Sequence, residues 1–335
     1  MPELRLDPLT GLRAIIAGER ASRPGAFSER VEPRPPIDAE TDPFLPGHEG
    51  MTPPEVWALR PGGGPPDTPG WIVRVVPNLY PALTAGDADD ATHDPLASGR
   101  GMPNLFVTKP AVGRHEVIVN TPEPVDSLSA LHPGDLETAM DAWRQRMRAH
   151  DGASYVHLIV NEGAAAGASL PHSHSQLYAL PFVPALIARE RERFTAYFER
   201  TQGRNLLGDL LQEEVRLRER VVAIGDEAVV ICPFASRSPY ELMLIPRRPR
   251  ARFQDDGPLG AGVLHEALAR LRAALGGMPA LNMWVRTAPA GAGEFCWHLD
   301  VLPRLAHLAG LEMGTGVSLN IVPPERAASE LRDAT

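Results

Sequence analysis

Residues 161–178 read NEGAAAGASLPHSHSQLY and combine a strand end, a loop of small residues and a second strand. Successive side chains of a strand alternate between its two faces, so this pattern predicts His172, His174 and Gln176 on one face. The small residues upstream, Gly167 among them, leave room for backbone N–H groups to approach an anion. The stretch therefore predicts a phosphate site that contains a nucleophile.

Two imidazoles and a carboxamide on one strand face are suited to phosphoryl transfer. A neutral histidine is a nucleophile at physiological pH, and transfer through it divides one displacement into two easier steps. His174 is the predicted nucleophile, with the backbone carbonyls of residues 171–172 as candidate acceptors for its second ring nitrogen. Ser169, Gln176 and loop amides near Gly167 are expected to stabilise charge on the phosphate oxygens. The competing interpretation is that both histidines are hydrogen-bonded strand residues without a chemical role.

Length, charge and cysteine content exclude several classes of protein. The 335 residues are 43% hydrophobic, enough for one large or two moderate globular domains. The net charge is −9 and there is no basic run, which argues against a nucleic-acid polymer as partner. No apolar run approaches the roughly 20 residues of a membrane span and no signal peptide is recognised, so a cytoplasmic protein is expected. Two cysteines, Cys232 and Cys296, exclude a disulfide framework and a multi-cysteine zinc site.

Hydrophobic periodicity predicts the same order of elements twice. In the first half, strands are expected at 71–76, 113–120, 155–161 and around 172–178, with a helix at 136–150. In the second half, strands are expected at 227–232, 241–246, 280–285 and 295–301, with a helix at 261–275. A further helix at 185–201 links the two. We interpret the chain as a tandem duplication of one antiparallel α+β unit, divided into 1–188 and 189–335, with residues 1–70 as an extended, loop-rich arm.

The sequence contains six ordered motifs that resemble the galactose-1-phosphate uridylyltransferase family, a branch of the histidine-triad superfamily. They are RLDPLTGLRAIIAGERASRP, PGHEGMTPPEV, VPNLYPAL, GRHEVIV, NEGAAAGASLPHSHSQL and LPRLAHLAGLEMGTGVSLN, spread nearly end to end. The resemblance implies two histidine-triad-like (HIT-like) antiparallel halves with flanking helices, the second degenerate. It also implies a homodimer and ping-pong transfer of a nucleoside monophosphate through a covalent nucleotidyl-histidine.

The resemblance carries roles over to individual positions. His174 matches the family's nucleophile, and Gln176 matches the glutamine that binds the transferred phosphate. Ser169 and Asn161 match polar residues on the phosphate side. Asn78, in PNLYPAL, matches a residue of the nucleoside pocket.

Two arginines in the segment ERASRP match basic residues near the phosphates. They are Arg20 and Arg23, and for each the alternative interpretation is a solvated surface charge. Because they belong to a projecting arm, a site completed by two subunits is a reasonable expectation.

The zinc ligands of many family members are missing. Those members use a CPFC motif, a histidine after the GxHEV strand and the first histidine of HxHxQ, whereas this chain has Asp42, Leu45 and Pro124 and retains only His172. One histidine and one aspartate cannot form a tetrahedral structural site. We therefore expect no structural zinc and no other cofactor, with proline-stiffened, apolar packing as the replacement restraint.

The second half shows a parallel loss. Its segments read NLLGD at 205–209, PRRP ending at Pro249 and CWHLD at 296–300. His298 with Cys296 or Asp300 could still contact a metal, although a core role is expected.

The leading functional hypothesis is a nucleotidyltransferase that moves a nucleoside monophosphate from a nucleotide sugar through His174 to a sugar 1-phosphate, with UDP-glucose and galactose 1-phosphate as default substrates by resemblance. The alternative is a nucleotide-sugar or dinucleoside-polyphosphate phosphorylase, resembling ADP-glucose phosphorylase, in which inorganic phosphate is the acceptor. The sequence SHSQ, at a position where uridylyltransferases often have PHGQ, keeps that alternative open. A second alternative is a non-catalytic nucleotide-binding protein, against which the retained histidines and glutamine argue.

Overall fold

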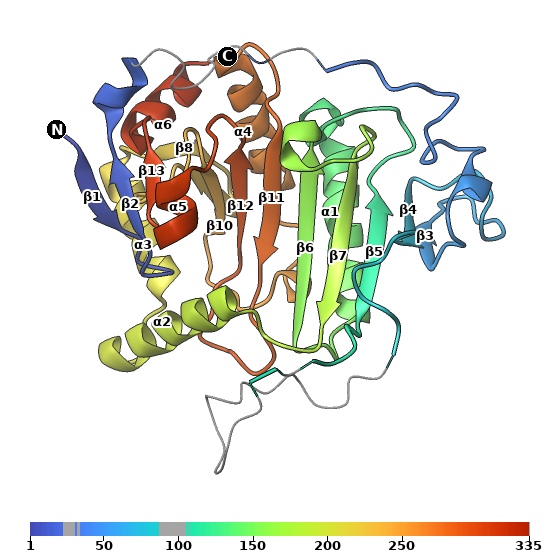
Figure 1. Cartoon of the computed structure of the whole chain (residues 1–335), viewed down its shortest axis with the longest axis horizontal. Coiled ribbons are helices and arrows are strands. Elements are labelled where there is room, and N and C mark those ends of the chain that lie inside the picture. The colour runs from blue at the N-terminus through green and yellow to red at the C-terminus, as the bar shows by residue number, and fades with distance from the viewer. Residues whose placement is uncertain (23–30, 32–33, 87–104, 107, 335) are drawn as a thin grey trace.

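A ten-stranded sheet, antiparallel throughout, forms the centre of the molecule (Figure 1). The computed structural model describes residues 1–22, 31, 34–86, 105–106 and 108–334. Across the sheet the strand order is β3-β4-β5-β7-β6-β11-β12-β10-β9-β8, and a separate three-stranded sheet has the order β1-β2-β13. The predicted α+β class is confirmed.

The elements have the following bounds. The large sheet contains β3 (Trp57–Leu59), β4 (Val73–Pro77), β5 (Arg114–Val119), β6 (Tyr155–Glu162), β7 (His174–Leu180), β8 (Val221–Ile224), β9 (Ala228–Ile231), β10 (Leu242–Pro246), β11 (Leu281–Arg286) and β12 (His298–Pro303), and the small sheet contains β1 (Glu3–Leu6), β2 (Arg13–Ile16) and β13 (Ser318–Asn320). The α-helices are α1 (Pro133–Ala149), α2 (Ala185–Thr201), α3 (Leu206–Leu217), α4 (Ala261–Ala274), α5 (Gly310–Thr315) and α6 (Pro324–Asp333). None of the helices in the described part of the chain is long and apolar enough to cross a membrane.

The strand order is symmetric about the β6–β11 pair. Outward from this pair, β6-β7-β5-β4-β3 on one side corresponds to β11-β12-β10-β9-β8 on the other. A local contact repeats as well. The His174 ring Nδ1 lies 2.7 Å from the His172 carbonyl oxygen, and the His298 ring Nδ1 lies 3.1 Å from the Cys296 carbonyl oxygen. The predicted repeat is therefore visible in the sheet, while the division at residue 188, which falls inside α2, stays a prediction.

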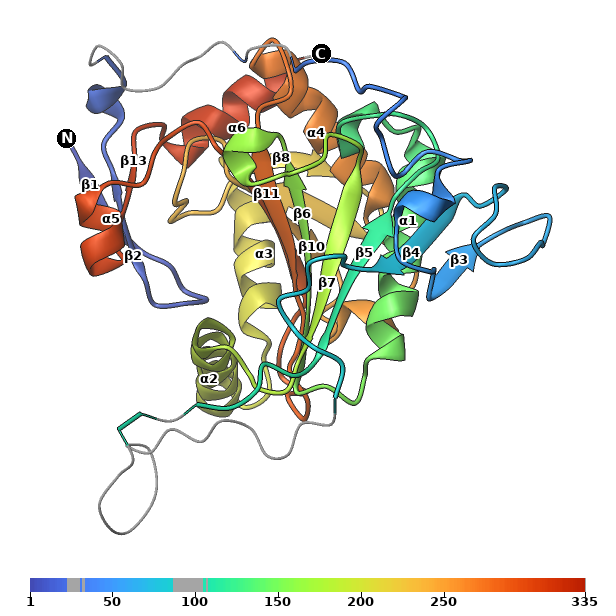
Figure 2. The same cartoon turned by 45° about the vertical axis from the view of Figure 1, so that its right-hand side comes forward.

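One face of the sheet is covered by helices α1, α4 and α6 (Figure 2). Along β6 the residues Val156, Leu158 and Val160 belong to the core on this face, as the two-residue period of a strand requires. α1 contributes Trp143 and Met147, both fully buried. Each such side chain stabilises the fold by about 1.5–3 kcal/mol relative to exposure.

The opposite face is covered only at its two ends. Over the second half, α2 and α3 pack Phe194 and Leu211 against the strands, while Phe44 and Trp71 pack against β4 and β5 of the first half. Between them, the strands β7, β6 and β11 carry half-buried side chains on this face: His157, Ile159, Asn161, Gln176, Tyr178, Asn282 and Trp284. The middle of this face is thus where a ligand can reach the sheet.

The prediction of a loop-rich arm over residues 1–70 is wrong in part. β1, β2 and β3 lie in that region and have only three or four residues each. β2 pairs in parallel with β13, about 300 residues along the chain, as in the partners Ala14 and Ser318. Strands of three or four residues are too short to show a clear two-residue periodicity, so the sequence does not reveal them.

We predict unequal costs for shortening two adjacent β6 residues. Leu158→Ala leaves a cavity beneath α1 and should lower the free energy of unfolding by about 2–5 kcal/mol. Ile159→Ala acts on the half-buried opposite face and should cost clearly less. Urea unfolding of both variants measures the difference, and equal losses would contradict the assignment of the two faces.

Candidate functional site

His174 begins β7 and is held by the backbone of its own segment. Its Nδ1 lies 2.7 Å from the His172 carbonyl oxygen, which can only accept, so Nδ1 carries the hydrogen. The predicted backbone acceptor at residues 171–172 is therefore present. The other ring nitrogen, Nε2, then carries the lone pair and has no hydrogen-bond partner among the described residues.

The surroundings of His174 keep its imidazole neutral. Burial lowers the pKa of His174 below its ordinary value, and the Phe44 ring lies over it with ring centroids 5.3 Å apart. A neutral ring with one N–H fixed and one free lone pair is the form of histidine that attacks an electrophile.

His172 is fully buried and both of its ring nitrogens are engaged. Nδ1 lies 2.6 Å from Asp42 Oδ2, and Nε2 lies 2.9 Å from the Thr121 carbonyl oxygen. Burial alone would raise the pKa of Asp42, but the hydrogen bonds from His172 and from the Phe44 N–H lower it below its ordinary value. The predicted restraint by apolar, proline-stiffened packing is incomplete: the Phe44 ring packs edge-on against His172 with centroids 5.9 Å apart, and a buried hydrogen bond to Asp42 also holds this histidine.

The donor set does not fit a structural zinc ion. Both nitrogens of His172 already contact protein oxygens, and the His298 Nε2 lies 3.3 Å from Glu190 Oε1. The Cys296 thiol is buried, with its Sγ 3.6 Å from the Trp297 carbonyl oxygen. Within the described ranges, no group of three or more His, Cys, Asp or Glu side chains is arranged to hold a metal.

Gln176 lies on the same face of β7 as His174 and contacts a histidine of β5. Its Oε1 is 2.9 Å from His115 Nε2 and accepts the Tyr178 hydroxyl at 3.0 Å. Asn78, directly after β4, places its amide nitrogen 3.1 Å from the same His115 Nε2. Asn78 and Gln176, far apart in sequence, therefore meet at His115, which the sequence analysis did not select although it lies in the GRHEVIV motif.

Asn161 connects the site to the second half of the chain. The β6–β7 ladder ends with the pair Val160 and Ser175, so Asn161 comes next along β6, beside His174. Asn282 of β11 donates to Asn161 Oδ1 and to the Ala166 carbonyl oxygen, each at 2.8 Å. The second half thus orients a residue next to His174, and only tertiary pairing could reveal this.

The loop before β7 satisfies several of its own amides. The Gly167 N–H donates to the Ala164 carbonyl oxygen at 2.9 Å, and the Ala168 N–H to that of Gly163 at 3.3 Å. Gly167 has a φ of +85°, which favours glycine, so its contribution is backbone conformation rather than a free N–H. Ser169 is exposed, with its side chain unpaired in the described structure.

The basic arm is not brought to the site. Arg20 lies in the 3₁₀ helix Gly18–Ser22, after β2 of the small sheet, and its side chain is exposed. No hydrogen bond or ion pair in the described chain joins it to β7. Arg23 lies outside the described residues.

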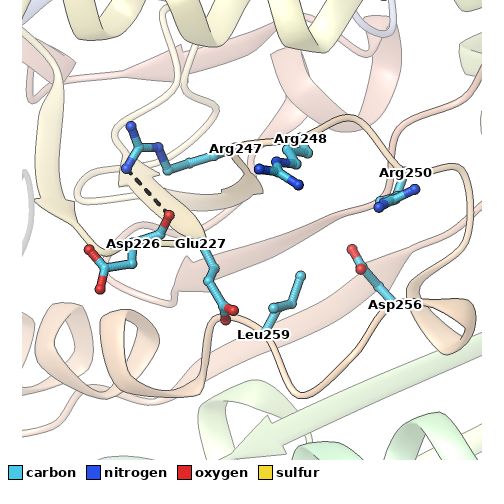
Figure 3. A pocket seen from close by; sticks show the side chains of 7 residues that line it. All are labelled: Asp226, Glu227, Arg247, Arg248, Arg250, Asp256 and Leu259. Atoms are coloured by element: carbon cyan, nitrogen blue, oxygen red, sulfur yellow. Dashed lines mark hydrogen bonds between the residues drawn. The ribbon is translucent and has the colours of Figure 1, made fainter.

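A pocket of about 680 Å³ lies in the second half, and His174 is not among its lining residues (Figure 3). It is lined by Asp226, Glu227, Arg247, Arg248, Arg250, Asp256 and Leu259. Its three arginines face three acids, and none of its residues was predicted to act in the site. Asp256 also accepts the indole N–H of Trp297 at 2.7 Å, which is a structural contact. The candidate site is the face around His174.

Comparison with known proteins agrees with this geometry. The family model "Galactose-1-phosphate uridyl transferase, N-terminal domain" matches residues 71–184, and a domain of unknown function, DUF4921, matches residues 129–334. An ADP-glucose phosphorylase of Arabidopsis thaliana is 30% identical over 346 residues, covering 100% of this chain and 93% of the relative. A galactose-1-phosphate uridylyltransferase of Thermotoga maritima is 26% identical over 99% of this chain and 98% of the relative.

Solved structures show the same fold. A crystal structure of an ADP-glucose phosphorylase from Arabidopsis thaliana with bound ADP-glucose superposes with a TM-score of 0.80 at 28% identity, covering both chains completely. The chain belongs to the galactose-1-phosphate uridylyltransferase family of the histidine-triad superfamily. It is an enzyme of the nucleotidyltransferase type, and the relatives favour the phosphorylase alternative over transfer to a sugar 1-phosphate.

We predict that the Asp42–His172 pair is required for stability. Asp42→Ala leaves the buried His172 without its carboxylate partner and should lower the free energy of unfolding by about 3–5 kcal/mol. Asp42→Asn keeps an oxygen acceptor and should cost less. Urea unfolding measures both, with Glu40→Ala, exposed in the preceding turn, as control. A chelator should leave the unmodified protein unchanged, and loss of stability on chelation would contradict the pair as the restraint.

Glu162, at the end of β6, is buried with one carboxylate oxygen unpaired. Its Oε1 accepts the Leu128 N–H at 2.6 Å, whereas its Oε2 has no partner in the described structure. Burial raises the pKa of Glu162 to about 7. The folded state therefore favours the protonated carboxyl, and ionisation opposes folding as the pH rises from about 4.5 to 7.

We predict that Glu162→Gln stabilises the protein at pH 8 and has little effect at pH 4.5. Glutamine keeps an acceptor for the Leu128 N–H without the buried charge, and a pKa shift of this size corresponds to roughly 3 kcal/mol. Unfolding free energies of both proteins at the two pH values test this. Glu137→Gln, at an exposed α1 position, is the control. An equal effect at both pH values would exclude the ionisation mechanism.

Proposed function

We propose that this protein transfers a nucleoside monophosphate from a nucleotide sugar to inorganic phosphate through a covalent intermediate on His174, as an ADP-glucose phosphorylase-like enzyme. The observation that carries the proposal is the state of His174, which is neutral, fixed through Nδ1–H to the His172 carbonyl and free at Nε2. The full-length relative of that activity supports the choice of reaction.

In the first step, Nε2 of His174 attacks the phosphorus that bears the nucleoside. The N–P bond forms as the bond from this phosphorus to the bridging oxygen breaks, and the sugar 1-phosphate leaves with the electron pair. Positive charge develops on the imidazole, and the His172 carbonyl accepting from Nδ1–H stabilises it. In the second step an oxygen of inorganic phosphate attacks the same phosphorus, the N–P bond breaks, and a nucleoside diphosphate is released.

The neighbouring residues are assigned to the phosphate and the nucleoside. Gln176 and Ser169 are proposed to donate to the equatorial oxygens, where charge increases in the transition state. Asn161, which accepts a hydrogen bond from Asn282, is proposed to border the transferred phosphate at His174. Asn78 is proposed to contribute to the nucleoside pocket. Gln176 and Asn161 belong to the half-buried face of β7 and β6, whereas Ser169 is in the loop before β7 and Asn78 follows β4.

Transfer to a sugar 1-phosphate is the second candidate. It differs only in the acceptor of the second step, and the match of residues 71–184 to the uridyl transferase model together with the Thermotoga maritima relative favours it. A non-catalytic nucleotide-binding protein would not need the free lone pair of His174.

We also propose that the protein carries out this function as a homodimer. Large apolar side chains are exposed on and just before α5, namely Leu308, Leu311 and Met313. Clusters of this kind on a protein surface mark interaction sites more often than single exposed residues do.

We predict that α-³²P-labelled ADP-glucose leaves label on the protein after denaturation and that His174→Ala abolishes it. The bond should be acid-labile and base-stable, as a phosphoramidate is. His132→Ser, at the exposed N-cap of α1, should label like the unmodified protein because serine also caps a helix. Chromatography of the products and labelling stoichiometry are the measurements.

The acceptor separates the two candidate reactions. Release of label as ADP on addition of phosphate supports the phosphorylase, whereas release from labelled UDP-glucose only on addition of galactose 1-phosphate supports the transferase. No label from either donor, or label that persists in His174→Ala, would contradict the covalent mechanism.

A further inference from the structure

His115 and Tyr178 form a bracket around the Gln176 carboxamide, and a backbone amide fixes the hydrogen-bond roles of His115. The Ala82 N–H donates to His115 Nδ1 at 3.1 Å, and a backbone amide cannot reverse its role. His115 is buried, and burial lowers its pKa, which keeps the ring neutral. A neutral imidazole with an accepting Nδ1 must carry its hydrogen on Nε2.

The orientation of the Gln176 carboxamide follows from this tautomer. His115 Nε2–H points at the Gln176 side chain 2.9 Å away, so the atom that meets it must be the carbonyl oxygen Oε1. The Tyr178 hydroxyl donates to the same oxygen at 3.0 Å. In the opposite tautomer, Nδ1–H would face the Ala82 N–H, which also donates. In the Nε2–H tautomer the Asn78 amide nitrogen, 3.1 Å from Nε2, faces a ring N–H, so this contact is not a hydrogen bond. The His115 N–H therefore fixes Oε1 on its own side, and the Tyr178 hydroxyl can donate to the same oxygen.

The bracket is also rigid. The rings of His115 and Tyr178 stack with centroids 4.1 Å apart and an interplanar angle of 22°. Burial raises the pKa of Tyr178, so its hydroxyl stays protonated and is able to donate to Gln176 Oε1. The Gln176 amide nitrogen then faces away from both rings, on the sheet face that carries His174, and has no hydrogen-bond partner in the described structure.

We infer that His115 and Tyr178 are positioning residues that hold the Gln176 amide NH₂ ready to donate to a phosphate oxygen at His174. The inference rests on the proposed function for the role of the phosphate. An unheld carboxamide could present either its oxygen or its nitrogen, and an oxygen facing an anionic phosphate is repulsive. A preset NH₂ avoids that reorganisation during the reaction, which is the basis of electrostatic stabilisation of a transition state.

Three variants separate the donor and acceptor roles in the bracket. Tyr178→Phe removes one donor to Gln176 and keeps the stacked ring. His115→Gln can still donate near the Nε2 position, whereas His115→Asn reaches only the Nδ1 position and loses the donor. We expect Tyr178→Phe and His115→Asn to slow nucleotidylation of His174 by about 10- to 100-fold, less than complete loss of such a donor costs, with partial rescue in His115→Gln. Tyr197→Phe, which loses a hydroxyl contact on α2, should have no effect.

A double-mutant cycle distinguishes positioning from general structural support. In a Gln176→Ala background, Tyr178→Phe and His115→Asn should cause no further loss of rate, because the group they position is absent. A further loss equal to that in the unmodified background would overturn the inference. Thermal unfolding identifies any His115 variant that fails to fold, in which case Tyr178→Phe alone decides the cycle.

A measurement on the free protein is independent of catalysis. With ¹⁵N-labelled histidine, NMR should show His115 as the neutral Nε2–H tautomer, assigned by its disappearance in His115→Asn. An Nδ1–H tautomer would overturn the inference. If the unmodified protein forms no label at all, the proposed function fails, and the tautomer measurement decides the bracket by itself.

Discussion

The pairing of β6 with β11 is the interaction on which the molecule depends. Four residue pairs, from Leu281 with Glu162 to Trp284 with Ile159, join two five-stranded halves into one sheet. Without this pairing each half would expose a strand edge, and the helices α1 and α4 would lose their shared platform. The same pairing places Asn282 against Asn161, so the site belongs to the joined sheet rather than to the first half alone.

The two halves show how one framework can carry different chemistry. In both, a histidine at the start of a strand has its Nδ1 near the carbonyl of the residue two positions earlier. In the first half, Nε2 of that histidine is free on the open face. In the second, His298 faces Glu190 of α2, and burial together with this carboxylate determines its charge: burial alone would lower its pKa, but Glu190 raises it. The presence of α2 over His298 therefore distinguishes this structural histidine from the candidate reactive His174.

The sequence reveals the parts of this protein that depend on local pattern. The helix at 185–201 and most strands of the large sheet follow from periodicity, and the HSHSQ segment locates His174. The partner of His172 lies 130 residues away, and the His115 that orients Gln176 lies 61 residues away. Such contacts arise from the sheet order and from chain crossings, which no short motif encodes. The prediction for His172 was incomplete for this reason, because the apolar packing of Phe44 was expected but the hydrogen bond from the distant Asp42 was not.

The Asp42–His172 pair also affects how the protein matures. A restraint provided by a metal is completed only when the ion is captured, so the yield of native protein depends on metal supply. A restraint made of two side chains of the same chain forms as the chain folds, and it depends on pH instead, because the lowered pKa of Asp42 means that the contact weakens as the pH falls. Among the described residues, the restraint next to His174 is thus supplied by side chains of the chain itself.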